Sequence, residues 1–276
     1  MNEKIFSYDS VNFHKTFAPQ DSYISKILEL AEYGYSGTKE EISKITGIPT
    51  GKTSGKVVPH ILYSYYMGLV NYKIEKGKLS LSLTDLGKVI YNEDKYLFED
   101  ITKLICHFNI SDETNGAYIW SFVYQQLPIM LNENISDELL KRKYKDYFFL
   151  DVDYRPMKKA YSDDGFWAVL NLMDFSEGLR INSTYYNNIM LYVYAYTLLS
   201  AWDKIYPTEQ EITIDQIVMN LKWNKRFGFD DDEMMYALEK MEETSILRLN
   251  KQLMPVTVIR TTNTASLLPY LYDYLN

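Results

Sequence analysis

Residues 21–90 constrain the fold most, because three short helical segments are followed there by a β-hairpin. Apolar side chains recur at helical spacing in each of the three segments. The helices are expected over about residues 22–33, from the N-cap Thr38, and from Thr53 or Ser54 to Gly68. Glu41 stands three residues after Thr38 and completes a capping box.

The hairpin follows directly. Residues 69–74 and 79–83 alternate between apolar and polar side chains, and the turn between them contains Lys76, Gly77 and Lys78. Thr84 then caps a further helix over residues 85–91. Three helices followed by a hairpin are typical of a winged helix-turn-helix.

Charge is unevenly distributed along the chain. The net charge is −8, yet residues 38–90 contain eight lysines and four acidic residues, a net of +4, so the rest sums to −12. A basic segment in an acidic protein indicates a local anion-binding surface.

The third helix and the hairpin supply the candidate DNA-binding residues. These are Lys52, Thr53, Ser54 and Lys56 at the start of the helix, and Lys73, Lys76 and Lys78 in the wing. The helix has no arginine to read guanine, so these residues favour contact with the phosphate backbone over base readout. A winged helix that contacts only protein is the alternative.

The whole chain is predicted to be mainly α-helical with short β-hairpins. We expect a winged-helix domain over residues 1–95, a helical middle region and connector over 96–182, and a winged-helix-like domain over 183–276. Within the middle region, residues 149–182 are expected to be an irregular polar connection. A basic run of Lys141, Arg142, Lys143 and Lys145 marks either a solvated helix face or a second phosphate-facing surface.

The C-terminal domain is expected to repeat the plan of three helices and a hairpin. Acidic residues 230–233 lead into its third helix, over 234–243, where they complement the helix dipole. Because such a helix repels DNA, a structural or partner-binding role is the better prediction for this domain.

Enzyme motifs have little support. Cys106 is the only cysteine, and the three histidines show no metal-binding spacing. Asp151 and Asp153 precede lysines in an arrangement that only loosely resembles a magnesium site. We therefore expect no metal and no cofactor, and identify no catalytic residue. No apolar stretch is long enough to span a membrane, and a soluble cytoplasmic protein is expected.

Several short motifs resemble, in order, those of the bacterial domain-of-unknown-function 4007 family. They are Phe13-His14-Lys15-Thr16-Phe17, Leu83-Thr84-Asp85-Leu86-Gly87, Leu97-Phe98-Glu99-Asp100, Ala117-Tyr118-Ile119-Trp120 and Ser266-Leu267-Leu268-Pro269-Tyr270-Leu271. The chain departs from the family at the third helix, where Ser54, Gly55 and Lys56 stand in place of arginines.

The resemblance implies a component of a bacterial DNA phosphorothioation and phage-defence system, with protein partners in a modification complex. It implies DNA binding or, alternatively, DNA nicking so that sulfur can be installed. His14 is the one motif residue with acid–base chemistry, and it is either a catalytic group or part of a structural clasp.

Overall fold

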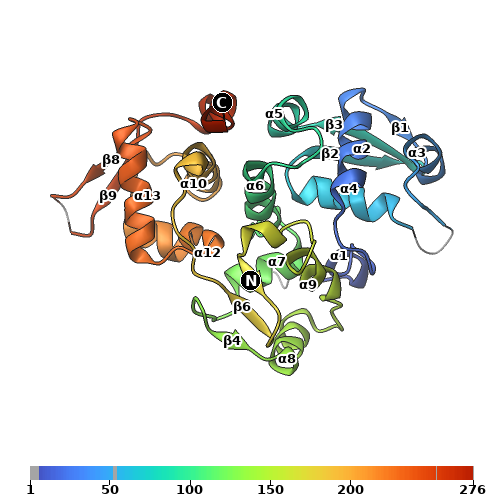
Figure 1. Cartoon of the computed structure of the whole chain (residues 1–276), viewed down its shortest axis with the longest axis horizontal. Helices are drawn as coiled ribbons and strands as arrows, with labels where there is room; N and C mark the ends of the chain where they lie inside the picture. The colour runs from blue at the N-terminus through green and yellow to red at the C-terminus, as the bar shows by residue number, and fades with distance from the viewer. Residues whose placement is uncertain (1–5, 52–54, 253, 276) are drawn as a thin grey trace. The chain divides into compact units, whose positions relative to one another are not determined.

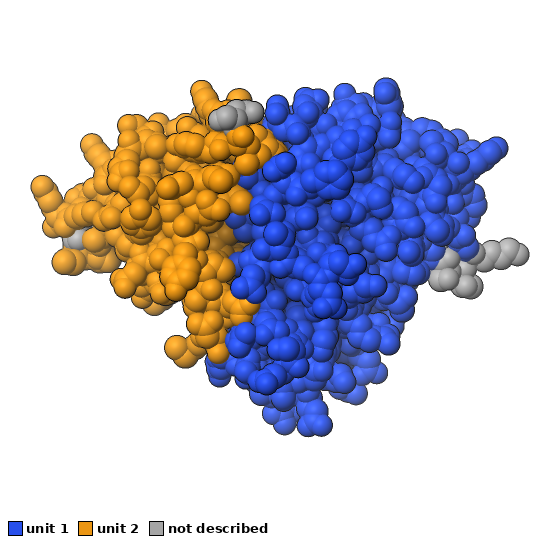
Figure 2. Space-filling model, in the orientation of Figure 1, with its two compact units in different colours: residues 1–129, 133–180 blue, residues 130–132, 181–276 orange. Residues whose placement is uncertain are grey.

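The computed structural model describes residues 6–51, 55–252 and 254–275. The chain divides into two compact units (Figure 2), one formed by residues 1–129 and 133–180, the other by 130–132 and 181–276. Within the described residues the protein is mainly helical, with three small three-stranded sheets. The fold is therefore mainly α with short β-hairpins, as predicted.

The first sheet and its helices, drawn in blue and teal in Figure 1, form what we call the first module. Its elements are α2 (Asp21–Glu32), β1 (Ser36–Gly37), α3 (Lys39–Thr46), α4 (Val57–Tyr66), β2 (Val70–Glu75) and β3 (Lys78–Leu83). The short helix α1 (Tyr8–Val11) precedes it and α5 (Asp85–Glu93) follows it. The sheet order is β1-β3-β2, with β3 antiparallel to both neighbours.

Local sequence signals explain this module well. The capping box at Thr38 is present, because the Thr38 hydroxyl accepts from the amide of Glu41 and the Glu41 carboxylate accepts from the amide of Thr38. Thr84 caps α5 and donates to the carbonyl of Gly68. A Cβ at Gly87 would lie 1.9 Å from the carbonyl oxygen of Leu69, so α5 approaches the sheet closely only because residue 87 is glycine.

A second set of elements, the middle module, follows the helix α6 (Asp100–Ile110). It consists of α7 (Tyr118–Gln125), β4 (Asn134–Ile135), α8 (Asp137–Phe148), α9 (Arg155–Tyr161), β5 (Met173–Asp174) and β6 (Leu179–Ile181), with a 3-10 turn at Ala168–Leu170. Its sheet order is β4-β6-β5. The irregular connection expected over residues 149–182 thus contains a helix and two strands, which are too short to leave an alternating pattern in the sequence.

The third module lies in the second unit, after a 3-10 turn at Asn188–Met190. Its elements are α10 (Leu191–Ile205), β7 (Glu211–Thr213), α11 (Ile214–Gln216), a π-helical turn (Ile217–Leu221), α12 (Trp223–Phe227), α13 (Asp231–Glu243), β8 (Leu247–Asn250) and β9 (Thr257–Arg260). The chain closes with α14 (Thr264–Leu267) and 3-10 turns at Leu268–Tyr270 and Asp273–Leu275. Its sheet order is β7-β9-β8.

The three modules share one order: helix, short strand, helices, and then two strands of which the last is central in the sheet. In each of them the short strand runs into a helix through a hydroxyl N-cap, supplied by Thr38, Ser136 and Thr213. A side-chain cap at this junction satisfies a helix amide at the point where strand pairing ends.

Aromatic side chains fill the core of each unit. In the first unit, Trp120 and Trp167 are fully buried with ring centroids 6.1 Å apart. In the second, Trp223 and Phe227 are buried 5.4 Å apart. No helix among the described residues is long and apolar enough to cross a membrane.

Candidate nucleic-acid interface

The predicted interface is described only in part. Lys52, Thr53 and Ser54 lie outside the described residues, as does the predicted start of the third helix. The described part of α4 begins at Val57, with Lys56 at its N-cap. The wing residues Lys73, Lys76 and Lys78 are all described and exposed.

Lys56 already has partners within the first unit. Its ammonium lies 5.6 Å from the ring centroid of Phe17 and 5.2 Å from that of Tyr23. Such cation–π contacts orient the ammonium without neutralising it. The sequence could not indicate them, because both rings lie more than thirty positions away along the chain.

A small hollow lies next to Lys56, at the start of α4. Its volume is about 160 Å³, and Lys15 and Lys39 are the charged residues in its lining. The Lys39 ammonium donates to the carbonyl of Gly51 at 3.0 Å. A Cβ at Gly55 would lie 2.7 Å from the Cα of Thr50, so glycine allows the loop to close here. Both lysines are already paired, Lys15 with Asp9 and Lys39 with Glu40, so the hollow offers no uncompensated cation to an anion.

The three wing lysines differ in whether they form an ion pair. Lys73 forms an exposed ion pair with Glu75. Lys76 lies in the turn with φ of 49°, and Lys78 begins β3 opposite Glu75. Neither Lys76 nor Lys78 forms an ion pair within the described residues. Both ammonium groups are exposed, and Lys78 also interacts with the nearby Glu41 carboxylate, whose pKa it helps to lower.

His14 lies in the core. It is fully buried, and its Nδ1 donates to the carbonyl of Lys15 at 2.9 Å. Burial lowers the pKa of His14 to about 4. Phe13 beside it packs edge-on against Tyr63 at 4.9 Å. The geometry favours the structural clasp, since a buried neutral imidazole cannot reach a phosphodiester at the surface.

His60 is buried in the same unit, inside α4. Its Nδ1 donates to the carbonyl of Lys56 at 2.7 Å, and burial lowers its pKa to about 4. It therefore helps to fix the first turn of α4 and presents no group to a ligand.

The carboxylates of the loop before α9 are held by cations. Asp153 accepts two hydrogen bonds from the Arg155 guanidinium, which hold the pKa of its carboxyl below the usual value, and Asp151 pairs with Lys145 at 3.3 Å. Among residues 6–51, 55–252 and 254–275, no group of three or more His, Cys, Asp or Glu side chains could hold a metal ion.

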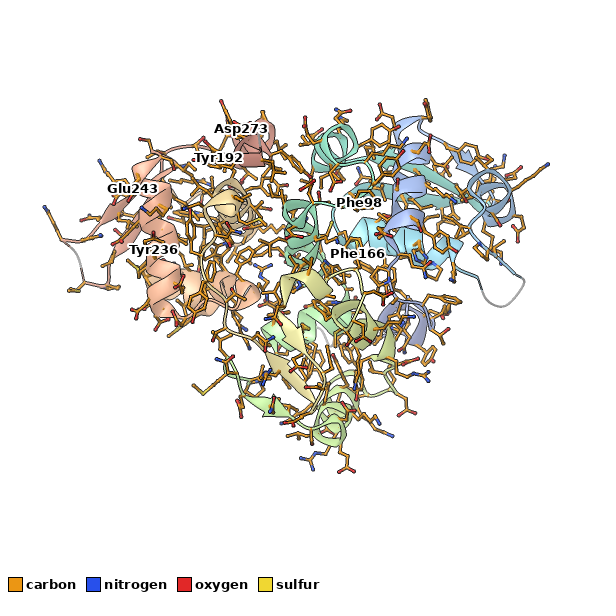
Figure 3. The ribbon with its side chains drawn as sticks, viewed as in Figure 1. Phe98, Phe166, Tyr192, Tyr236, Glu243 and Asp273 are labelled. Atoms are coloured by element: carbon orange, nitrogen blue, oxygen red, sulfur yellow. The ribbon has the colours of Figure 1, made fainter. Side chains whose placement is uncertain are left out.

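The third module presents the opposite charge. Asp230 caps α13, and Asp231, Asp232 and Glu233 occupy its first turn. Tyr236 and Glu243 also belong to α13 (Figure 3), and both are exposed. The acidic third helix expected from the sequence is thus present, although it begins at Asp231.

Comparison with known proteins identifies two solved structures that share the fold of this chain. No protein-family model matches the chain, and no curated protein matches it. A magnesium-ion-bound SspB crystal structure matches with a TM-score of 0.75 at 16% sequence identity, covering 97% of this chain and 89% of that chain. A second SspB crystal structure matches with a TM-score of 0.73 and the same identity and coverage. The chain therefore shares its fold with SspB over nearly its full length, while its resemblance to the 4007 family stays an expectation.

Proposed function

We propose that the chain binds DNA through the first module, which we interpret as a winged helix. The order of α2, β1, α3, α4 and the β2–β3 hairpin supports this interpretation, as does the central position of β3. The observation that carries the proposal is the pair of exposed wing lysines, Lys76 and Lys78, neither of which forms an ion pair in the described structure although the protein is acidic.

We further propose that this binding serves a bacterial DNA phosphorothioation and phage-defence system. The setting rests on the resemblance to the 4007 family, and the full-length fold likeness to SspB is compatible with it. The acidic third module is the part that we assign to a protein partner in such a complex, because its surface repels nucleic acid. We assign no nicking activity to any residue of this chain.

The test is fluorescence anisotropy of a labelled DNA duplex of about three helical turns, titrated with the full chain at several salt concentrations. Reversing Lys76 and Lys78 together to glutamate should weaken binding on the order of tenfold or more and reduce the slope of log affinity against log salt by roughly 2.

The matched control is the Arg248→Glu, Lys251→Glu variant, which makes the same charge change in the hairpin of the third module. It should bind as the unaltered chain does. Absence of binding at low salt, or an equal loss in both variants, would refute the proposal.

A further inference from the structure

The groove between α8 and α9 is a cationic hollow that the DNA-binding proposal above does not use. Its volume is about 530 Å³, and it is lined by Lys141 from α8, by Arg155 and Lys158 from α9, and by the carboxylates of Asp137 and Asp153. Three cations against two carboxylates leave the lining net positive.

The two carboxylates do not neutralise the groove. Asp153 is bound by the Arg155 guanidinium at 2.8 and 2.7 Å, and Asp137 lies 3.9 Å from the Lys158 ammonium. Lys141 has no ion-pair partner among the described residues. The groove is therefore lined by one ammonium without an ion-pair partner and by two cations that are paired with carboxylates, a net positive lining that suits a phosphate oxygen.

The surface around the groove carries more unpaired cations. Arg142 and Lys159 are exposed and Lys143 is half-exposed, and none of the three forms an ion pair in the part of the chain that the structure describes. Residues 137–161 contain seven cationic and five acidic residues, a net of +2, while the rest of the chain sums to −10. A local excess of this sign concentrates anions.

The position of α9 in its module strengthens the case. It stands where α4 and α13 stand in the other two modules, as the helix before the last two strands. Of these three helices, α4 contains no lysine or arginine, α13 is predominantly acidic, and α9 contains three cations and no acid. The middle module thus has the most basic helix at the position that faces DNA in a helix-turn-helix.

Hydrogen bonds also connect the loop at the groove to the N-terminal segment of the same compact unit. The side chain of Asn12 donates to the carbonyl of Asp151 at 3.2 Å and accepts from the amide of Asp153 at 2.8 Å. Figure 1 shows α1, just before Asn12, next to α9. Lys15, three residues further on, lines the hollow at the start of α4. The N-terminal segment therefore contacts the groove through Asn12 and lines the hollow at the start of α4 through Lys15.

We propose that the groove between α8 and α9 binds the phosphate backbone of nucleic acid, as a contact separate from the wing. Here the middle module is the second phosphate-facing surface, and its basic run is more than a solvated helix face. The contact is independent of Lys76 and Lys78, which belong to the β2–β3 hairpin of the first module.

The test uses the full chain, the labelled duplex and the salt series described above. Reversing Lys141 and Lys159 to glutamate should weaken binding on the order of tenfold and reduce the salt slope by roughly 2. The Lys141→Arg, Lys159→Arg variant should bind as the unaltered chain does, because it keeps both charges. Circular dichroism and the thermal midpoint verify that each variant is folded.

The outcomes separate the two proposals. Loss of binding in the Lys141, Lys159 reversal, beyond that of the Arg248, Lys251 control, supports the groove whatever the wing variant does. Unchanged binding, or a loss equal to that of the control, overturns the groove, and the wing proposal then stands if its own variant is impaired. A chain that binds no duplex at low salt refutes both.

Discussion

The first and third modules share an element order and differ in charge. Residues 38–90 have a net charge of +4, while residues 183–276 contain eight cations and twelve acids, a net of −4. Cations of the third module are bound by acids, as in the pairs of Lys251 with Glu239 and Arg260 with Asp203. In residues 38–90, Lys73 and Lys88 are likewise paired, but Lys76 and Lys78 form no ion pair among the described residues. One topology is thus compatible with opposite surfaces, because caps and apolar residues determine the fold while exposed charge determines the ligand.

The largest expected difference between the units is their response to acid. All three histidines lie in the first unit, and burial lowers the pKa of His14 and of His60 to about 4. Below the unfolded value of about 6.5 the unfolded chain binds protons that the folded chain does not, so stability falls as the pH falls from about 6.5 towards 4. At pH 5 each histidine should cost about 2 kcal/mol of the free energy of unfolding.

Hydrogen exchange followed by mass spectrometry at pH 7 and pH 5, corrected for intrinsic rates, measures this for each unit separately. The first unit should lose protection and the second, which has no histidine, should keep it. Equal losses in the two units would show that the buried histidines do not cause the difference.

A smaller effect on stability is expected at the strand-to-helix junction that the first and third modules share, and it should be the same in both modules. Thr38 and Thr213 form the same capping box, with Glu41 and Gln216 as the reciprocal partners. Thr38→Ala and Thr213→Ala should each lower the stability of their module by about 1 kcal/mol. Urea unfolding monitored by local hydrogen exchange measures both, and the serine variants, which keep the hydroxyl, serve as controls. A cost at only one site would mean that the two junctions are not equivalent.

The smallest effect is expected on DNA binding, when the charge of the first turn of the acidic helix α13 is reversed. Asp231→Lys together with Asp232→Lys should tighten binding to the DNA duplex by less than about tenfold, because Coulombic repulsion is removed while no new wing is created. The gain should disappear as salt rises. Weaker binding by this variant would show that α13 contributes to the interface and would break the contrast between the modules.

Local signals in the sequence predicted much of the first and third modules. The cap at Thr38, the alternating strands and the threonine and glycine of residues 83–87 each act within a few residues, so their consequences can be derived without tertiary contacts. The helical character of the middle region was predicted, but its sheet and α9 were not, because β4 and β5 have two residues each and Pro156 obscures the start of α9.

The candidate site was less predictable than the fold. The sequence showed which segments are basic, but not which cations remain unpaired. The ring contacts of Lys56 and the convergence of Lys141 with Lys158 depend on segments brought together only by folding. A run of basic residues in the sequence therefore indicates which surface binds an anion. Only the three-dimensional structure shows which cations of that surface are already paired with acids and which are not.

The most direct test of the contrast between the modules is lysine acetylation of the full chain, quantified by mass spectrometry with and without the DNA duplex. DNA should protect Lys76 and Lys78 of the wing, Lys141 of the groove and Lys159 on the surface around it, while Lys251 of the third module keeps its reactivity. Protection confined to the third module, or no protection at a saturating DNA concentration, would contradict the assignment of nucleic-acid binding to the first unit.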